Sequence, residues 1–214
     1  MAGPGLRELK KQTTRRLLSE TAWRLFAERG FEHVTVLEVA RAAQVSEGTL
    51  FNYFPTKESL VFDPMLGYEA RLLDAVRERP RGEPALAALA RFLAAGADHA
   101  AEPGVGDTIA TTARMVAGSP ALRGRQEQIL AEHTQVLAGL LAGDTGAAAG
   151  DPAVQAAAHA LKGVHRAVLE TTRRAALAGE RGERLAATVR DAAEAAAAAV
   201  GAGFRDFAPR PDGG

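Results

Sequence analysis

Residues 35–57 read TVLEVARAAQVSEGTLFNYFPTK and contain the signals for two short helices joined by a tight turn. Thr35 and Glu38 have the spacing of a capping box, in which each side chain bonds the other residue's backbone amide at a helix start. Ser46 is a second N-cap candidate, and a proline follows the helix expected at 47–54. The segment therefore predicts a helix, a turn and a second helix.

This order of elements matches the helix-turn-helix of DNA-binding proteins, whose two helices of about eight residues are joined by a short turn. Ala40 lies where the helices pack most closely, so a larger side chain would push them apart. Polar groups on the outer side of the second helix can bind base edges, and Asn52 can pair bidentately with adenine. Tyr53 and Lys57 flank this face and suit phosphate contacts.

Residues 15–62 resemble the DNA-binding region of the tetracycline-repressor (TetR) family. The matching motifs are LFAERGF before the two helices, VT..EVA.AA.VS.GTL within them and YFPTKESL after them. The resemblance implies that one set of residues faces the major groove: Glu47, Gly48, Thr49, Phe51 and Asn52. It implies that a second set faces the phosphates: Thr35, Ser46, Tyr53 and Lys57.

Two positions depart from the family pattern. Gln44 stands in the turn where the family usually has glycine, so a left-handed backbone there would cost roughly 1 kcal/mol. Phe51 stands where tyrosine is usual, which removes a hydroxyl able to touch DNA. Both changes are compatible with the fold, but they leave the base contacts of Phe51 open.

The segment before the motif is basic. Between residues 6 and 16, five basic side chains stand against one acidic side chain, an excess of +4. These residues are Arg7, Lys10, Lys11, Arg15 and Arg16, with Glu8 as the acid. A basic arm ahead of a helix-turn-helix suits attraction to phosphates, and the alternative is a merely solvated helix start.

Composition favours an all-α fold. Hydrophobic residues make up 47% and charged residues 24% of the 214 residues, which is ordinary for a globular protein. Alanine, the best helix former, dominates the second half, and no extended β-branched run competes with it. The net charge of +0 argues against a protein that coats nucleic acid or membranes through charge alone.

Proline, glycine and cap signals divide the chain into an N-terminal three-helix helix-turn-helix DNA-binding domain at 1–56, a helical ligand-binding and dimerisation domain at 57–205, and a disordered tail at 206–214. Pro64 is expected to kink or restart the helix at 57–79, because a mid-helix proline removes a hydrogen bond. Further helices are expected at 8–29, 84–99, 106–117, 121–142, 152–178 and 182–200, with a flexible linker at 143–151.

The last two expected helices carry apolar stripes with small residues that allow close approach. The stripe residues are Val154, Ala158, Leu161, Val168, Leu185, Val189, Ala192, Ala196 and Val200. They can form ordinary core within one chain or the four-helix dimer interface that the TetR resemblance implies. A two-fold dimer reaches successive major grooves about 34–36 Å apart, so we expect a homodimer on a palindromic double-stranded DNA operator.

The TetR resemblance also implies that the middle helices enclose a cavity for a small effector. The apolar candidates are Phe62, Met65, Tyr68, Leu72, Phe92, Ile109, Met115, Leu130 and Val136, with plain core as the alternative for each. The polar candidates are His99, Thr112, Arg114, His133 and His165. Composition fits an apolar or amphipathic effector. Pro64, in the helix that joins the two domains, is the expected pivot.

Enzyme chemistry finds no support in the sequence. Cysteine is absent, the histidines are scattered, and no HExxH, GxSxG or Walker pattern occurs, so no catalytic residue, metal site or cofactor is expected. No apolar run reaches the roughly 20 residues of a membrane span, and the start lacks a signal-peptide core, so a cytoplasmic location is expected. The sequence predicts a ligand-responsive homodimeric repressor. The alternative is a DNA-binding activator or architectural protein without an effector.

Overall fold

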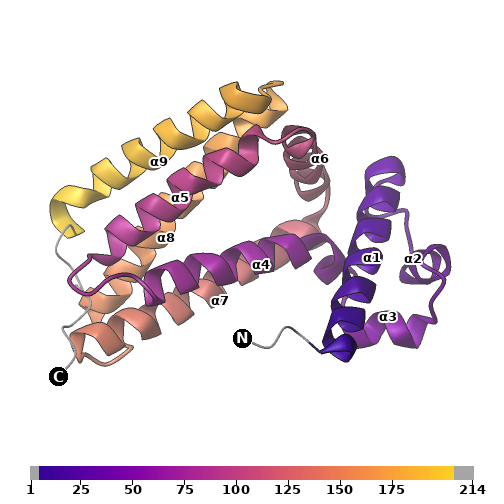
Figure 1. The fold of residues 1–214 in the computed structure, drawn as a ribbon, viewed down its shortest axis with the longest axis horizontal. Coiled ribbons are helices and arrows are strands. Elements are labelled where there is room, and N and C mark those ends of the chain that lie inside the picture. Colours follow the sequence, from indigo (N-terminus) through magenta and orange to yellow (C-terminus); the bar gives the residue numbers. More distant parts are fainter. Residues whose placement is uncertain (1–4, 205–214) are drawn as a thin grey trace. The chain divides into compact units, whose positions relative to one another are not determined.

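The computed structural model describes residues 5–204, without the side chains of residues 6–8 and 202–204. The elements within it are α1 (Leu6–Arg29), α2 (Val36–Ala42), α3 (Glu47–Tyr53), α4 (Lys57–Arg77), α5 (Ala85–Ala101), α6 (Val105–Gly118), α7 (Pro120–Thr145), α8 (Pro152–Leu177) and α9 (Gly182–Phe204) (Figure 1). The all-α prediction is confirmed, and the linker expected at 143–151 is shorter because α7 extends to Thr145. The tail predicted at 206–214 and the side chains of Arg7 and Glu8 lie outside the described residues. No helix within residues 5–204 has the length and apolarity needed to cross a membrane.

The described chain packs as two compact units that share three helices. Unit 1 comprises residues 5–66 with 114–126, and unit 2 comprises residues 67–113 with 127–204. Helices α4, α6 and α7 each begin in one unit and end in the other. The domain boundary predicted at residue 56 follows the helix-turn-helix motif, whereas packing also joins the first part of α4 to unit 1.

Unit 1 is built around α1. Its buried side chains include Leu18, Ala22, Phe26, Val39, Leu50, Phe54 and Leu60. Helix α1 ends at Gly30, whose φ of 85° suits a residue without a Cβ atom. Phe31 then folds back so that its ring meets Phe26 edge-on, with 5.1 Å between the ring centroids. Phe31 therefore packs on the last turn of α1.

Pro64 lies inside α4 without ending it, so of the kink or restart expected there the restart does not occur, and the kink stays a prediction. Proline has no N–H, which leaves the carbonyl of Leu60, four residues earlier, without its helical donor. The hydroxyl of Ser19 in α1 donates to that carbonyl oxygen at 3.5 Å. The proline therefore opens a backbone acceptor on α4, and α1 binds to it.

In unit 2, α5, α8 and α9 pack side by side (Figure 1). Their apolar faces form one core with parts of α4, α6 and α7. The stripe predicted for a dimer interface lies in this core: Val154, Ala158, Leu161, Val168, Leu185 and Val189 are buried, and Ala192, Ala196 and Val200 pack against them. The six buried residues are therefore core within one chain, because a buried side chain has no surface left for a second chain. Ala192, Ala196 and Val200 are half-buried, so their place in a dimer interface stays a prediction.

Polar side chains are also buried in unit 2. Glu69 of α4 is fully buried, and its Oε2 accepts from Lys162 Nζ at 2.7 Å. Lys162 Nζ also donates to Nδ1 of His165, one turn further along α8, at 3.1 Å. Burial, reinforced by the charge of Lys162, lowers the pKa of His165 to about 3. The buried imidazole is therefore neutral in the folded protein at neutral pH.

Acid should destabilise the protein through His165. The unfolded histidine titrates near its ordinary pKa of 6.5, whereas the folded ring resists protonation down to about 3. Across this window protons bind the unfolded chain preferentially, so the free energy of unfolding falls by up to about 1.4 kcal/mol for each pH unit lost. We expect His165→Gln to flatten this slope, measured by urea unfolding at several pH values in the window.

The matched control is His159→Gln, because His159 is exposed on the same helix and should leave the slope unchanged. The other groups that act on the His165 ring are Glu69, Lys162, Arg173 and His133, and they are present in both variants. Identical slopes for the wild type and His165→Gln would contradict a neutral buried ring.

Candidate nucleic-acid interface

Helix α2 begins with the predicted capping box. The Thr35 hydroxyl accepts from the Glu38 N–H at 3.2 Å, and Glu38 Oε2 accepts from the Thr35 N–H at 2.7 Å. Arg29, at the end of α1, pairs with the other oxygen of Glu38 at 2.7 Å. The backbone bond from Thr35 first, and then the bond from Arg29, lower the pKa of Glu38 to about 2. The start of α2 is thus tied to the end of α1 by an ionised carboxylate.

The turn between α2 and α3 contains the left-handed residue anticipated at Gln44. Its φ is 57°, the only positive φ of a non-glycine residue within residues 5–204. The next residue, Val45, donates its N–H to Ala40 O at 3.0 Å, and Ala40 is 1% exposed. Close packing at Ala40 is therefore confirmed. The turn maintains a conformation that costs roughly 1 kcal/mol for a residue with a side chain.

Helix α3 presents an outward face of small and polar groups together with one aromatic ring, that of Phe51. Its exposed residues are Glu47, Gly48, Phe51 and Asn52, and its half-buried ones are Thr49 and Tyr53. Nothing lies within 4 Å of the position that a Cβ atom would take at Gly48. The packing of the chain therefore does not require this glycine. Its effect is to leave room outside the helix.

Ser46 caps α3 as predicted. Its Oγ accepts from the Thr49 N–H at 3.1 Å and lies 2.7 Å from the Thr49 hydroxyl. The cap therefore satisfies one backbone donor and also fixes the Thr49 side chain at the exposed end of the helix.

The side chain of Lys57, which was expected to bind phosphate, also contacts two aromatic rings of unit 1. Its Nζ lies 4.1 Å from the ring centroid of Phe31 and 5.7 Å from that of Phe26. Burial lowers the pKa of this half-buried lysine. The ammonium therefore makes cation–π contacts with the core of unit 1 as well as standing beside α3 in the sequence.

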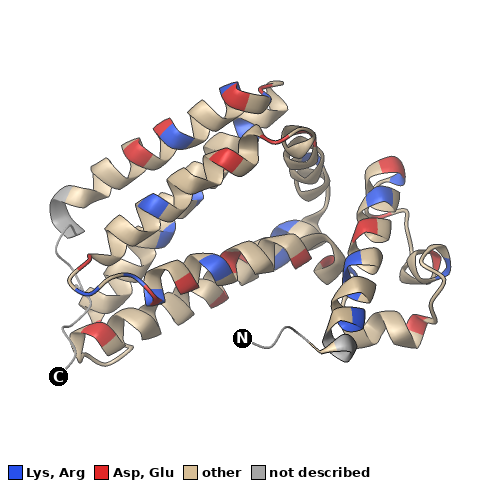
Figure 2. Cartoon of the chain, viewed as in Figure 1, with Lys and Arg blue, Asp and Glu red and all other residues tan. Residues whose placement is uncertain are grey.

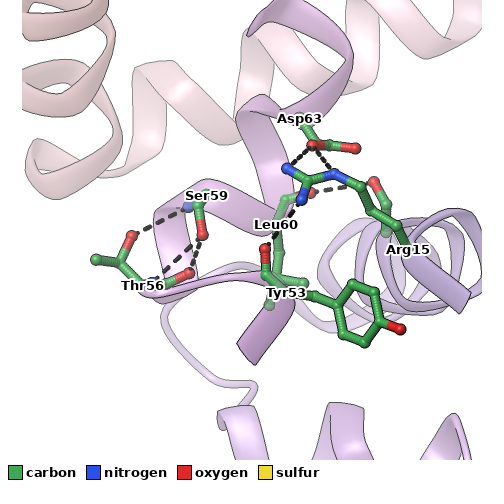
Figure 3. Close-up of polar contacts among 7 residues, drawn as sticks. Arg15, Tyr53, Thr56, Ser59, Leu60 and Asp63 are labelled. Atoms are coloured by element: carbon green, nitrogen blue, oxygen red, sulfur yellow. Dashed lines mark hydrogen bonds and ion pairs between the residues drawn. The ribbon is translucent and has the colours of Figure 1, made fainter. Parts of the chain in front are cut away.

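Arg15 was expected in the basic arm, but the structure uses it to join three helices. Its guanidinium donates twice to Asp63 Oδ1 of α4, at 2.8 and 2.5 Å, and once to the Tyr53 carbonyl at the end of α3, at 3.1 Å (Figure 3). It also lies 4.7 Å from the ring centroid of Phe54. No local pattern predicts this role, because the partners lie 38 and 48 residues away.

The remaining basic side chains of the arm stay on the surface. Lys10 and Lys11 are exposed, and Arg16 makes only a 3.7 Å contact with Glu20 one turn along α1. Figure 2 shows blue residues along α1, whereas α3 contains no lysine or arginine. Basic residues therefore occur before and after α3 in the sequence, but none lies within α3 itself.

The start of α4 has its own cap, formed by Thr56 and Ser59. The Thr56 hydroxyl accepts from the Ser59 N–H at 3.2 Å, and Ser59 Oγ accepts from the Thr56 N–H at 3.3 Å (Figure 3). The two side chains thus cap the helix reciprocally, as a capping box does.

A second tie reaches the helix-turn-helix from a distant part of the sequence. Ser119, between α6 and α7, donates its hydroxyl to Glu32 Oε1 at 2.5 Å, within unit 1. The same hydroxyl accepts from the Leu122 N–H at 3.3 Å, so it also caps α7. No local pattern predicts this contact, because 87 residues separate the partners.

The residues predicted to line an effector cavity separate into groups. Tyr68, Phe92 and His165 lie together in unit 2, with ring centroids 5.2 Å apart for Tyr68 and Phe92 and 5.7 Å apart for Tyr68 and His165. Leu72 and Leu130 are buried, whereas Ile109, Thr112 and His133 are half-buried. Phe62, Met65, Arg114 and Met115 belong to unit 1.

Three of the predicted cavity residues lie on the surface of the chain, and Arg114 of unit 1 is one of them. His99 is exposed and pairs with Glu102 at 3.2 Å, and Val136 is 47% exposed. Both project from the solvent side of their helices, so neither lines the interior of unit 2.

The contacts of Arg15 with Asp63, Tyr53 and Phe54 lead to a testable prediction about stability. Arg15→Lys keeps the charge but loses the planar fork that reaches two acceptors, so we expect unit 1 to lose about 1 kcal/mol of stability. Unfolding is followed by the fluorescence of Trp23, the single tryptophan, which lies in α1. The neighbouring variant Arg16→Lys is the control and should change stability by less than about 0.5 kcal/mol. Equal effects of the two substitutions would rule out the role assigned to Arg15.

Two family models match the chain. The model described as bacterial regulatory proteins of the tetR family matches residues 18–63, which contain α2 and α3. The model described as the MftR C-terminal domain matches residues 83–176, from just before α5 to the end of α8.

Individual relatives agree with these models. The HTH-type transcriptional regulator TcmR of Streptomyces glaucescens is 39% identical over 87 residues, covering 41% of this chain and 38% of TcmR, so the match spans well under half of that relative's length. The structure of a putative tetR family regulator from Shewanella sp. PV-4 is 26% identical, with a TM-score of 0.51 over 86% of this chain and 95% of that one. Thermus thermophilus FadR, a TetR family repressor solved with lauroyl-CoA, shares the fold at 22% identity and a TM-score of 0.51 over 85% and 92% of the chains. With both its N-terminal and its C-terminal regions matched in this way, the chain belongs to the TetR family of bacterial transcriptional regulators.

Proposed function

We propose that this protein is a homodimeric, ligand-responsive repressor that binds a palindromic DNA operator. The outward face of α3 carries the proposal, because Glu47, Gly48 and Asn52 are exposed on a helix whose N-terminus is capped. Such a protein acts as a regulator and not as an enzyme. Since its proposed ligand is chromosomal DNA, we also propose a cytoplasmic location.

The residues of this face have distinct proposed roles. Asn52 and Thr49 bind base edges, and Glu47 accepts from a cytosine amino group. The exposed ring of Phe51 offers an apolar contact to a thymine methyl group in place of the missing hydroxyl. A last set, which surrounds the helix, binds phosphates and positions it: Thr35, Ser46, Tyr53 and Lys57.

Base readout and phosphate binding respond differently to substitution. Asn52→Ala should cost about 1–3 kcal/mol of affinity for the operator and little for other sequences, so specificity falls. Lys57→Met should weaken binding to every duplex and reduce the salt dependence by about one counterion. Footprinting on the DNA around the protein's own gene supplies the operator, and fluorescence anisotropy at several salt concentrations measures both effects.

Gln128→Ala, an exposed position in unit 2, is the control and should leave both affinities unchanged. An unchanged ratio of operator to scrambled-duplex affinity in Asn52→Ala would show that this residue does not read bases.

Dimerisation is proposed on the outer face of α8. The stripe facing inward is core, but Ala156, Ala160, Gly163 and Ala167 are not buried and recur at helical spacing. Small side chains allow two helices to approach closely, as in a four-helix bundle. A two-fold axis here pairs two recognition helices with two half-sites.

Gly163→Arg tests this face. Nothing lies within 4 Å of a Cβ atom built at Gly163, so an arginine is accommodated within one chain. We expect the variant to remain folded, to sediment as a monomer and to lose most of its operator affinity, because one recognition helix reads too few base pairs. Gly139→Arg is the matched control, since Gly139 is exposed on α7 with the same open space. A dimeric Gly163→Arg would refute the proposed interface.

The effector is proposed to act through α4, which both units share. A ligand changes DNA binding only if it binds the released state better than the DNA-bound state. Pro64 remains the predicted pivot, because the helix there lacks one of its own hydrogen bonds.

A further inference from the structure

Glu69 of unit 2 has a carboxylate oxygen without a hydrogen-bond partner. Its side chain is fully buried, and Oε2 accepts from Lys162 Nζ at 2.7 Å. Oε1 is the buried side-chain oxygen that lacks a partner in the described part of the chain. Buried polar atoms are nearly always paired, so this oxygen requires a specific explanation.

His165 lies close to this oxygen but does not supply a proton. Its Nδ1 is 3.5 Å from Glu69 Oε1 and 3.1 Å from Lys162 Nζ. An ammonium group can only donate, so Nδ1 is the acceptor of that bond and carries a lone pair. Burial and the charge of Lys162 lower the pKa of His165 to about 3, which keeps the ring neutral. Oε1 therefore faces a lone pair and remains an open acceptor.

Two aromatic rings continue from His165, the residue that lies 3.5 Å from the open acceptor. Tyr68, the neighbour of Glu69 in α4, stacks on His165 with 5.7 Å between centroids and 26° between planes. Phe92 of α5 lies 5.2 Å from Tyr68. Tyr68 and Phe92 are half-buried, so the ring cluster extends from the buried carboxylate to the surface of unit 2. Aromatic ring faces together with a buried, unpartnered acceptor are the mixture of apolar and polar groups that is typical of a small-molecule site.

The charges around Glu69 are already balanced. Glu69 pairs with Lys162, and Arg173, whose charge also acts on His165, has a counter-charge in Glu170. A cationic or anionic ligand group would add an unpaired charge to the interior, which is strongly unfavourable. A neutral O–H group brings the missing donor without any charge.

We propose that Glu69 Oε1 selects the effector, and that the effector is a neutral, planar aromatic molecule whose hydroxyl donates to this oxygen while its ring packs on Tyr68 and Phe92. This inference rests on the proposed ligand-responsive function. It narrows the apolar or amphipathic effector expected from composition to a phenol-like class. The effector then bonds directly to a side chain of α4, the helix proposed to carry the signal.

Three probes with the same ring system test this selection. 2-Naphthol has the ring and the O–H donor, 2-methoxynaphthalene has the ring without the donor, and 2-naphthoate carries a negative charge. Titration calorimetry on the full chain should give an affinity for 2-naphthol about tenfold above that for the ether, as expected for a hydrogen bond to a charged acceptor. The naphthoate should bind most weakly.

The decisive variant is the double substitution Glu69→Met with Lys162→Met. Replacing a buried ion pair by apolar residues of similar volume is often neutral for stability, so this variant is expected to fold. Its preference for 2-naphthol over the ether should disappear. Glu69→Gln keeps the shape of the side chain and should give an intermediate preference. Glu78→Gln, exposed just after α4, is the control and should match the wild type.

Three results would each overturn the assignment of Glu69: equal wild-type affinities for 2-naphthol and the ether, an unchanged preference in the double variant, or no saturable binding of any probe. Operator binding by the same proteins separates this test from the proposed function. The double variant changes no residue of unit 1 and should keep wild-type operator affinity. Failure of the wild type to bind any operator would instead overturn the proposed function.

Discussion

The guanidinium of Arg15 bonds to two helices from a third, and the position of the outward face of α3 depends on it. It holds Asp63 of α4 and the Tyr53 carbonyl at the end of α3, while its plane lies over Phe54. Arginine suits this task because its rigid fork addresses acceptors in two directions at once. Next to it, the carbonyl that Pro64 leaves open on α4 accepts from Ser19 of α1. Helices α1 and α4 are thus joined by two adjacent contacts, and α3 is fixed to the same point.

Two positively charged side chains near the helix-turn-helix stabilise the fold through contacts within unit 1. Arg15 pairs with Asp63, and Lys57 lies over the ring of Phe31. The outward face of α3 is left with hydroxyl, amide and carboxylate groups and the ring of Phe51, and it contains no lysine or arginine. The same principle operates in unit 2, where Glu69 and Lys162 neutralise each other within an apolar core. In both units, charged side chains are paired within the fold. The ligands that each unit can bind therefore depend on the positions of its remaining polar groups more than on its overall charge.

The helices and the turn could be predicted because their signals are local. The capping box of Thr35 with Glu38 and the cap by Ser46 act within a few residues, so the sequence order alone identifies them. The left-handed backbone at Gln44 was expected from the TetR resemblance, which places a glycine there. The ties from Arg15 to Asp63 and from Ser119 to Glu32 join residues 48 and 87 positions apart, and no local pattern encodes such pairs. The apolar stripe on α8 and α9 shows a third case. Helical periodicity predicts that a face is buried, but not whether its own chain or a second one covers it.

The Ser119–Glu32 bond also bears on how such proteins can be recombined. Unit 1 is discontinuous in sequence, because residues 114–126 pack with residues 5–66. A gene fusion that grafts only the first 66 residues onto a foreign helical core leaves behind the serine that binds Glu32 and caps α7. A chimera that takes its DNA-binding unit from this protein must therefore contain both segments of unit 1, residues 5–66 and 114–126. Unit 1, which contains the DNA-binding motif, is therefore compact in the folded structure but not continuous in the sequence.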